Sequence, residues 1–545
     1  MGDVLEAQVV VVGSGAAGIP LSLELAESGL DVILLEAGSE SLESRAQSLY
    51  AGKVEHPSLH PPADKYRQRR LGGTTPIWGG RCVPLDPIDF AERKYVPFSG
   101  WPISMEDLAP FYPAANDWLE AGDFAYQNED VFSDSVAPMI AGFESSVISL
   151  DSLERFSRPT DLFARYKPRL QVNPNIRVIS EANCINVSLH NNAKSVKKLV
   201  LKTFDGNEFF VRAGSYVLAA GGIETARLLL VSNDVNENGV GNEHDVVGRY
   251  YMCHIAGNVG KLRFNLPSSD IRHGYETSPD GIYCRRRISF FETEQLHKGV
   301  NNVVLRLHFP RISDPAHKSG VLSVIYLLKS FVSYEYATRL RDGDGDNFVS
   351  LLQHLKNALL SPFETSRWGI GWIAKRILAS RKFPSIILEN KTNMFSLEAN
   401  GEQCPNYDSR IYLADELDEL GLRRVVIDWK YSAQDIHSVK VTLHTFQQEL
   451  ERLGIGQLEF DEESLEDDLL RFGALGGHHI GTARMGTDPI TSVVDRNCKV
   501  HNLDNLYIAG SAVFPTSGQA NPTLTITALA VRLADHLVRQ DRVDV

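Results

Sequence analysis

Cysteine is scarce in this chain, and its placement argues against two kinds of site. The 545 residues include six cysteines, and no two of them are spaced as C-x-x-C. Zinc sites and dithiol redox centres normally show that spacing in the sequence. Scattered cysteines also fit a reducing compartment. We therefore predict that the protein holds no metal site and resides in the cytoplasm.

Basic residues are also in deficit, and long apolar runs are missing. Lys and Arg number 55 against 69 Asp and Glu, which gives a formal net charge of -14. A nucleic-acid-binding protein would show a basic excess, so we expect no nucleic-acid partner. We find no run of about 18 uncharged apolar residues that could span a bilayer, and no signal peptide ahead of the first strand. A chain of this length needs more than one hydrophobic core.

What the chain does contain begins with a strand, a glycine-rich turn and a helix. The β-branched run Gln8–Val12 leads into G-S-G-A-A-G at 13–18, and a second strand after the helix ends at Glu36. In such a unit the helix N-terminus faces a pyrophosphate, and the acid binds ribose hydroxyls. The acid would repel a 2′-phosphate. The motif predicts a dinucleotide but does not distinguish NAD from FAD.

Two polar residues near the end of the chain are candidates for a catalytic pair. His478 lies in G-G-H-H-I-G-T-A-R-M-G, and Asn521 lies in S-G-Q-A-N-P-T ahead of an apolar helix. Histidine can take or give a proton near neutral pH, and a neighbouring carboxamide can bond to the oxygen that it deprotonates. The alternative for each residue is a structural role in a turn or in the core.

These C-terminal segments resemble the glucose–methanol–choline (GMC) oxidoreductases. H-H-I-G-T-A-R-M-G is similar to their H-x-x-G-T-x-R-M-G signature, and L-G-G-T-T-P-I-W-G-G-R at 71–81 is similar to their second flavin motif. The resemblance implies FAD, with His478 and Asn521 facing the flavin. Some sugar-oxidising relatives carry a histidine before the tryptophan that bonds covalently to FAD. Ile77 stands there, so we expect non-covalent FAD.

The resemblance also implies which residues touch the cofactor and the substrate. We expect substrate contacts from His479 and Gln519. The expected cofactor contacts come from the first glycine-rich turn, the second flavin motif, a strand in mid-chain and the C-terminal segment: Gly13, Gly15, Ala16, Ala17, Gly18, Glu36, Ala37, Gly72, Gly73, Thr74, Trp78, Gly79, Gly80, Cys184, Ala220, Gly221, Gly510, Ser511, Pro522 and Thr523.

Several polar features are predicted to be structural. The basic cluster Arg67–Arg70 is expected in a solvated loop. Glu224 and Arg227, at helical spacing, are expected to form a surface pair. The acidic run at 461–468 is expected on a solvated face. For His254 we favour a packing role over a catalytic one.

The predicted fold is α/β: a discontinuous Rossmann-type FAD-binding domain plus a substrate-binding domain with a large, mostly antiparallel sheet and helices. The FAD-binding domain is assigned three separate segments, and the C-terminal segment contains the catalytic residues. The ranges are 1–95 (first FAD-binding segment), 96–165 (a substrate-side helical region), 166–255 (second FAD-binding segment), 256–470 (substrate-binding domain) and 471–545 (third FAD-binding segment).

Residues 321–383 depart from this plan. They combine apolar stretches and aromatic residues with charges that are mostly basic from Lys356 to Lys382. We favour helices that pack on the substrate domain. The alternative is a basic amphipathic segment that lies on an anionic membrane surface or forms a lid. Asp342–Asp346 alternates Asp with Gly, but the downstream Glu of a calcium loop is missing, so we predict a turn.

The resemblance implies FAD-dependent oxidation of a CH–OH group in a sugar, glycoside or related alcohol. His478 would remove the hydroxyl proton, His478 and Asn521 would hold the alkoxide, and hydride would pass to flavin N5. Two alternatives stay open. The electrons could pass to a quinone or a protein acceptor instead of oxygen, or the chain could be a non-catalytic flavin-binding protein that serves a partner.

Overall fold

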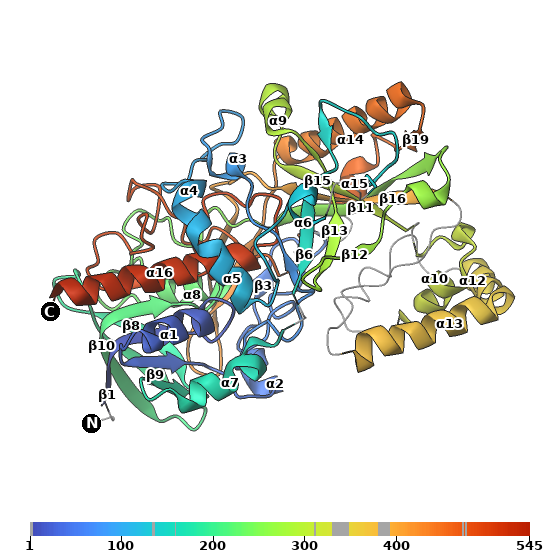
Figure 1. The fold of residues 1–545 in the computed structure, drawn as a ribbon. Coiled ribbons are helices and arrows are strands. Elements are labelled where there is room, and N and C mark those ends of the chain that lie inside the picture. Colours follow the sequence, from blue (N-terminus) through green and yellow to red (C-terminus); the bar gives the residue numbers. More distant parts are fainter. Residues whose placement is uncertain are drawn as a thin grey trace.

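The computed structural model describes residues 4–132, 137–157, 160–309, 312–329, 348–379, 393–470, 474 and 477–544. It contains a nucleotide-binding unit, a second unit around an antiparallel sheet, and a group of helices to one side of that sheet (Figure 1). The predicted α/β fold, with one sheet for the nucleotide-binding unit and a large antiparallel sheet for the second unit, is confirmed.

A seven-stranded sheet forms the centre of the nucleotide-binding unit. Its core is parallel, because β1 pairs in parallel with β2 and β10, and β10 with β20. Parallel strands are covered on both faces and are therefore apolar throughout, as the buried run Val9–Val12 illustrates. The strand order is β7 (Ile176–Ile179), β2 (Val32–Leu35), β1 (Val4–Val12), β10 (Glu208–Leu218), β9 (Val196–Lys202) and β8 (Asn183–Leu189), with β20 (Leu506–Ile508) beside β10.

Four helices cover this sheet, and the first follows β1 through the glycine-rich turn. Gly13 has φ +106°, and a Cβ on Gly18 would lie 1.8 Å from the carbonyl oxygen of Gly13. Only glycine tolerates both conditions, so the motif fixes the strand–helix geometry. The helices are α1 (Gly18–Glu27), α7 (Leu162–Val172), α8 (Gly222–Val231) and α16 (Thr523–Asp544).

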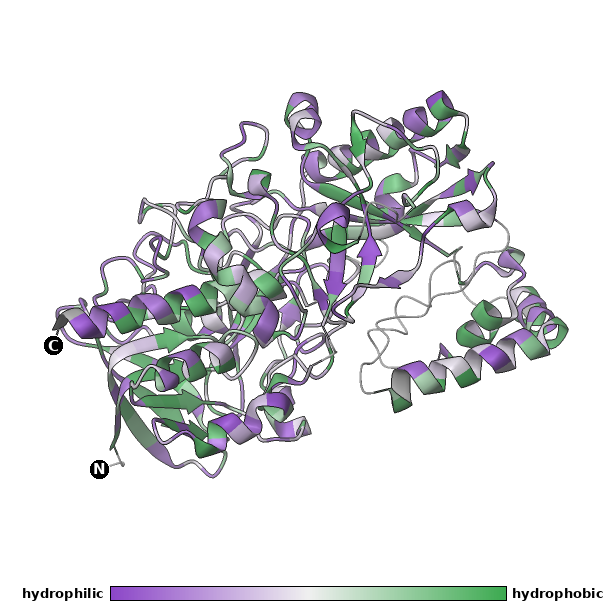
Figure 2. Ribbon diagram, viewed as in Figure 1, coloured by the Kyte–Doolittle hydropathy of each residue, from purple (hydrophilic) through white to green (hydrophobic). Residues whose placement is uncertain are grey.

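The second unit is built on a six-stranded, fully antiparallel sheet. Its order is β19 (Gly456–Glu459), β11 (His254–Phe264), β16 (Met394–Glu402), β15 (Val303–His308), β14 (Ile288–Phe290) and β5 (Ile148–Ser149). Helix α14 (Ala433–Leu453) packs on it and buries Val439, Leu443, Phe446 and Leu450. The apolar faces of this helix and sheet meet in one core (Figure 2). In α15 (Leu465–Leu470), Glu466 and Asp467 are exposed, which confirms the predicted acidic face.

Smaller elements connect the two units. Strands β5 and β6 fall inside 96–165, where we expected a helical region. One small sheet contains β12 (Tyr275–Thr277), β13 (Tyr283–Arg286), β6 (Leu153–Phe156) and β4 (Arg81–Cys82); another contains β17 (Arg410–Leu417), β18 (Arg423–Asp428) and β3 (Lys53–Val54). The short helices are α2 (Ser44–Ser48), α3 (Pro87–Phe90), α4 (Met105–Leu108), η1 (Ala109–Phe111), α5 (Tyr112–Trp118), α6 (Asn128–Val131), η2 (Ser268–Asp270), α9 (Glu292–Lys298), η3 (Pro315–His317) and η6 (Ser511–Val513).

The third group corresponds to the basic apolar segment. It contains α10 (Gly320–Leu327), α12 (Phe348–Leu360), α13 (Pro362–Trp372) and a π-helical turn, η5 (Ile373–Leu378). Among the described residues, no helix is both long enough and apolar enough to cross a bilayer. The turn predicted at Asp342–Asp346 lies outside the described residues.

Candidate active site

A cavity of about 790 Å³ is lined by residues of both units. The predicted cofactor residues on its wall are Gly13, Gly15, Ala16, Ala17, Glu36, Ala37, Gly73, Thr74, Trp78, Gly79, Cys184, Ala220, Gly221, Gly510, Ser511, Pro522 and Thr523. Gly18, Gly72 and Gly80 do not line it. Their Cα hydrogens point at neighbouring protein atoms instead, so these three glycines serve close packing.

Bare backbone faces the cavity on the side of the nucleotide-binding sheet. A Cβ on Gly15, Gly79, Gly221 or Gly510 would meet no atom within 4 Å, although all four line the cavity. Helix α1 begins there with no side-chain cap and no acidic residue in its first turn, so its N–H groups remain available to an anion. This chemistry fits a dinucleotide that carries a pyrophosphate.

Glu36 directly follows β2 at this wall, and neighbouring N–H and O–H groups donate hydrogen bonds to its carboxylate. Its Oε2 accepts hydrogen bonds from the Ser14 amide (3.1 Å) and hydroxyl (2.7 Å), and its Oε1 accepts one from the Gly38 amide (3.0 Å). Burial raises the pKa of Glu36, although these hydrogen bonds oppose the shift. The carboxylate is thereby fixed beside the turn, where ribose recognition was predicted.

The two predicted catalytic residues meet at the cavity wall. The Nε2 atom of His478 lies 3.1 Å from the Nδ2 atom of Asn521, although 43 positions separate the residues in the chain. On the other side of the ring, His478 Nδ1 lies 2.9 Å from Nδ1 of His254, the first residue of β11. The imidazole is therefore held from both sides.

Proton positions follow from what each partner can donate. An amide Nδ2 only donates, so it requires an unprotonated Nε2 on His478, and His478 must then carry its proton on Nδ1 and donate it to His254. His254 is fully buried, and burial lowers its pKa to about 4. Backbone acceptors at Gly518, Ala520 and Ser517 partly oppose this shift, because they favour a proton on its ring. The Nε2 atom of His254 makes no well-aligned hydrogen bond to any of the described residues. Because Nδ1 of His254 accepts from His478, the neutral ring carries its own proton on Nε2.

His479, expected to bind substrate, lines the cavity but is tied to a second network behind it. His60 Nδ1 donates to the Pro61 carbonyl (2.7 Å), so its Nε2 accepts from the Tyr251 hydroxyl (2.8 Å). That hydroxyl oxygen lies 2.6 Å from His479 Nδ1, which must donate to it. Nε2 of His479 is consequently an acceptor, and no described protein group bonds to it.

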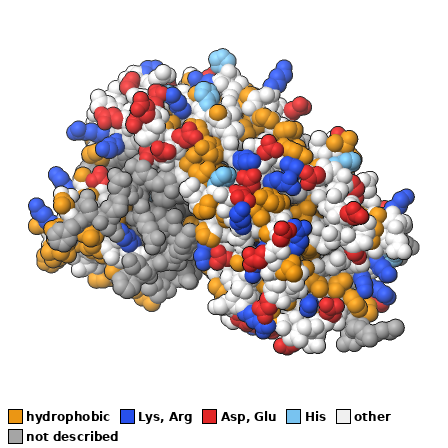
Figure 3. Space-filling view, turned by 180° about the vertical axis from the view of Figure 1, so that it is seen from behind, with side chains coloured by type: hydrophobic (Ala, Val, Ile, Leu, Met, Phe, Trp, Pro, Cys, Tyr) orange, Lys and Arg blue, Asp and Glu red, His pale blue; other side chains and the backbone are white. Residues whose placement is uncertain are grey.

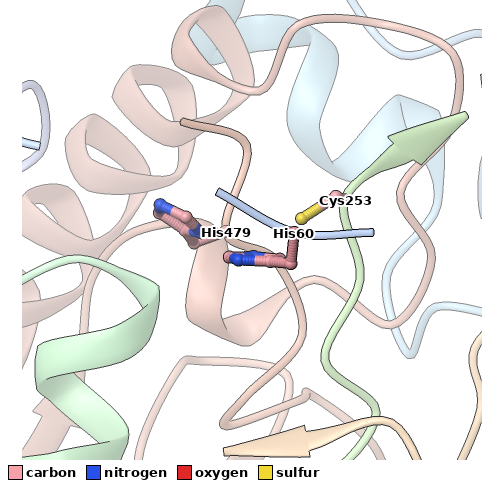
Figure 4. A group of neighbouring side chains, drawn as sticks. All are labelled: His60, Cys253 and His479. Carbon is pink, nitrogen blue, oxygen red and sulfur yellow. The ribbon is translucent and has the colours of Figure 1, made fainter. Parts of the chain in front are cut away.

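The same network contains a potential metal-ligand group. Ligand atoms of His60, Cys253 and His479 lie within 4.8 Å of one another (Figure 4). However, the Tyr251 hydroxyl bonds to both imidazoles and lies 3.4 Å from the Cys253 sulfur. Burial also raises the pKa of Cys253 to about 12, whereas a metal ligand must be a thiolate. The group is arranged as a neutral hydrogen-bond network.

Two structural predictions were wrong. Arg67 and Arg69 do not lie in a solvated loop, and Glu224 with Arg227 is not a surface pair: all four are almost buried. Glu224 on α8 contacts Arg67 at 3.2 Å and Arg69 at 3.3 Å. The available signal was that each pair of charges lies next to a Gly-Gly step of a predicted cofactor segment, 72–73 or 221–222; a charge buried there must be paired.

Sequence reasoning missed the substrate-side wall. Gln519 does not line the cavity, since its side chain donates to Asp86 at 3.1 Å. The wall is instead formed by polar and aromatic side chains from strands of the small and large sheets and from nearby loops: Trp78, Arg81, Phe156, Asn258, Tyr275, Arg285, His308, Phe395, Glu398 and Asn400. The sequence signal for this wall was the presence of polar residues at alternate positions of a strand, such as Glu398 and Asn400 on β16.

Comparisons with known proteins show which families and proteins this chain is similar to. Residues 405–530 match the family model described as GMC oxidoreductase, and residues 8–76 match an FAD binding domain. Paromamine 6′-oxidase of Streptomyces fradiae is 22% identical over 96% of this chain and 90% of its own. The large subunit of fructose dehydrogenase from Gluconobacter japonicus is 23% identical over 98% of both chains.

Solved structures share the fold. A formate oxidase superposes with a TM-score of 0.54 at 16% identity over 100% of both chains. A pyridoxine 4-oxidase superposes with a TM-score of 0.52 at 18% identity over 97% of this chain and 99% of its own.

Proposed function

We propose that this chain is an FAD-binding GMC oxidoreductase that oxidises a CH–OH group of a sugar, glycoside or related alcohol to a carbonyl. The observation that carries this proposal is the 3.1 Å contact between His478 and Asn521 at the cavity wall. FAD supplies the hydride acceptor when bound. Ile77, which lines the cavity, has no nucleophilic atom, so we propose non-covalent attachment.

The side chains divide the proton chemistry between them. His478 Nε2 carries no proton and accepts from Asn521; the alcohol hydroxyl displaces that contact, and Nε2 then takes its proton. The Asn521 amide then donates to the substrate oxygen as negative charge develops there. His254 acts as a positioning residue, because accepting the Nδ1 proton of His478 keeps Nε2 in its basic form. The tautomer of His478 is thereby set before the substrate arrives.

The test is anaerobic reduction of the bound flavin by sugars and alcohols. His478→Ala should slow bleaching of the flavin by about a hundredfold or more. His444→Ala is the matched control, since that histidine is partly exposed and pairs with Glu462. Near-normal reduction in the His478→Ala variant would reject the role of His478.

The polar wall supports a hydroxyl-rich substrate. Asn258, Asn400, Tyr275 and His308 face the cavity beside the aromatic rings of Trp78 and Phe156. Amide and phenol groups bond to hydroxyls, and aromatic faces cover the C–H faces of sugar rings. The names of two relatives reported above also support a hydroxyl-rich substrate: one is a paromamine 6′-oxidase and the other a fructose dehydrogenase.

The electron acceptor is a separate question, because one of those relatives is called an oxidase and the other a dehydrogenase. Oxygen on the one hand and a quinone or a redox protein on the other are the candidate acceptors. Admitting air to the reduced protein decides between them. Reoxidation within the time of a turnover supports oxygen, and persistent bleaching that a soluble quinone reverses rejects it.

We further propose that α12 and α13 contact an anionic membrane. Phe363 is 90% exposed, and Leu359, Leu360 and Ile370 are each at least 70% exposed. Apolar side chains gather in this region beside the grey residues in Figure 3. The neighbouring charges are mostly basic in an acidic protein: Lys356, Arg367 and Lys375 against the single acid Glu364. Apolar and basic side chains together suit the surface of an anionic bilayer.

Vesicle sedimentation tests the membrane contact. The whole protein should bind vesicles that contain phosphatidylglycerol, less so at high salt, and should not bind pure phosphatidylcholine. Leu359→Ser with Phe363→Ser should abolish this binding, whereas Val172→Ser, at a 79% exposed site on α7, should not. Equal behaviour of the two variants would contradict the proposal.

A further inference from the structure

Five charged side chains from five strands form a network at the substrate-side wall. They are Arg81 on β4, Glu154 on β6, Arg285 on β13, Arg306 on β15 and Glu398 on β16. Every one of these side chains is less than 20% exposed. The network joins the small sheet to the large one, and Arg81, Arg285 and Glu398 line the cavity.

Each carboxylate already has a closely bonded guanidinium. Nε of Arg306 donates to Glu154 at 2.6 Å, and Nη1 of Arg285 donates to Glu398 at 3.2 Å. Arg81 is the third cation. Its Nε lies 3.4 Å from Glu154 and its Nη2 lies 3.5 Å from Glu398, which are long contacts for charged hydrogen bonds. The guanidinium of Arg81 therefore makes weaker ion pairs than those of Arg306 and Arg285.

The network holds three positive charges and two negative ones. Burial opposes ionisation of the carboxyls, but the surrounding guanidiniums outweigh it and hold the pKa of Glu398 well below its usual range. Burial lowers and the carboxylates raise the pKa of Arg81, with a net upward shift, so Arg81 stays protonated. The other acidic residues on the cavity wall are Glu36 and Glu224. Glu36 is bound by the first turn, and Glu224 by the arginines beside it.

An unbalanced charge in a largely buried wall is unfavourable unless a ligand neutralises it. We propose that Arg81, supported by Arg285, binds a carboxylate of the substrate, so that the preferred substrates are acidic sugars or similar hydroxy acids. A single excess positive charge matches a carboxylate better than a phosphate dianion. The planar guanidinium can also donate two parallel hydrogen bonds to a carboxylate. The inference rests on the proposed function, because it names the substrate class of that same site.

The cofactor does not account for this charge. Its pyrophosphate is expected at the first turn of α1, on the nucleotide-binding sheet. The partners of Arg81 are instead on β6 and β16, beside Asn400 and Tyr275 of the substrate-side wall. An anion held by Arg81 would share the cavity with His478, so the proposal requires one molecule that presents both a carboxylate and an oxidisable hydroxyl.

The experiment compares D-glucuronate with D-glucose, which differ in the carboxylate. Binding is measured in the FAD-loaded His478→Ala protein through the flavin absorbance, and kcat and KM are measured in the otherwise native enzyme. Glucuronate should bind at least about tenfold more tightly than glucose. Arg81→Gln should raise KM for glucuronate by about tenfold or more, with kcat changed less than about threefold and glucose unaffected. Arg81→Lys should recover part of the loss.

Two controls keep the outcomes distinct. Arg272→Gln, at a 40% exposed arginine paired with Glu276, should change neither constant. If Arg81→Gln fails to fold, the wild-type preference decides alone: equal binding of the two sugars overturns the proposal, and a preference that fades with salt supports it. An unchanged preference in folded Arg81→Gln also overturns it.

The same data separate this inference from the proposed function. If glucose bleaches the flavin and Arg81→Gln has no effect on the preference, the function stands and the carboxylate site fails. If no sugar bleaches the flavin but glucuronate still binds through Arg81, the carboxylate site stands and the proposed oxidation fails.

Discussion

The two sides of the cavity differ in whether backbone or side chains form the wall. On the nucleotide-binding side the wall is largely backbone: Gly15, Gly221 and Gly510 present bare peptide to open space. On the opposite side the wall consists of side chains on strands, with Arg81, Arg285 and Glu398 among them. A backbone wall can accept the flat, invariant surface of a cofactor. A side-chain wall can change its recognition by substitution while the strands stay in place.

The difference also determines what holds each wall together. The glycine-rich wall is positioned by buried apolar strands such as β1, so its stability lies in packing. The charged wall is positioned by ion pairs with little access to solvent. Removing one partner there leaves an uncompensated buried charge. Substitutions on the cofactor side should therefore affect binding, and those on the substrate side should affect stability as well.

The largest expected effect is on stability at the charged wall. Glu154→Gln removes the fully buried carboxylate between Arg306 and Arg81. We expect the first unfolding transition of the FAD-loaded protein to lose about 3–5 kcal/mol, measured by chemical denaturation. Glu419→Gln, which breaks an exposed pair with Arg45, should leave it unchanged. A small loss for Glu154→Gln would mean that packing holds both walls.

The next effect is on cofactor binding at the backbone wall. Gly15→Leu would place a side chain in space that the structure leaves open. Forcing a ligand past it costs about 1–3 kcal/mol, or about ten- to hundredfold in FAD affinity, measured by titrating FAD into the apoprotein. Gly369→Leu, at an equally open glycine on α13, should bind FAD normally. If Gly15→Leu retains full affinity, that wall is not the FAD site.

A similar or smaller effect is expected at His254, which contacts His478 but does not line the cavity. Replacing it with Leu removes the acceptor for His478 Nδ1 but keeps the bulk of the side chain. We expect flavin reduction to slow by about ten- to hundredfold, with KM little changed. His254→Gln restores an acceptor and should recover part of the rate. A merely structural role would predict equal loss in both variants, accompanied by a lower melting temperature.

The smallest effect concerns pH and the buried histidines behind the walls. Burial lowers the pKa of His60 and of His254 to about 4, below the value near 6.5 of an unfolded chain. The unfolded state therefore binds more protons between pH 6.5 and 4, so stability is fully present above pH 6.5 and is lost as the pH falls. Each histidine contributes at most about 1.4 kcal/mol per pH unit. Denaturation of His254→Leu should show a shallower slope; an equal slope would contradict the assignment.

Much of the cofactor side was predictable because its signals are local. The turn at 13–18 needs glycine for reasons of nearby backbone geometry, and a β-branched run before it predicts a buried strand. Helix α14 was likewise predicted from its Ser432–Asp435 capping box and its apolar stripe. Recognition of the family added the pairing of His478 with Asn521, which spacing alone does not indicate.

The buried charges were not predictable in the same way. The cluster around Arg67 was expected in solvent, because a charged residue in a loop is usually exposed. Its burial depends on Glu224, which lies 157 positions away. The contact of His254 with His478 spans 224 positions and requires the start of β11 to meet the C-terminal segment.

The sequence by itself determined that this chain binds a dinucleotide, that it has two kinds of sheet, and which imidazole is the candidate base. Only the tertiary structure decided which side chains surround that base, which tautomer they impose on it, and where an unbalanced positive charge lines the cavity. The physical reason is one of range. Backbone conformation and apolar periodicity are set by neighbours along the chain, whereas the neutralisation of buried charges depends on partners that only folding brings within a few ångströms.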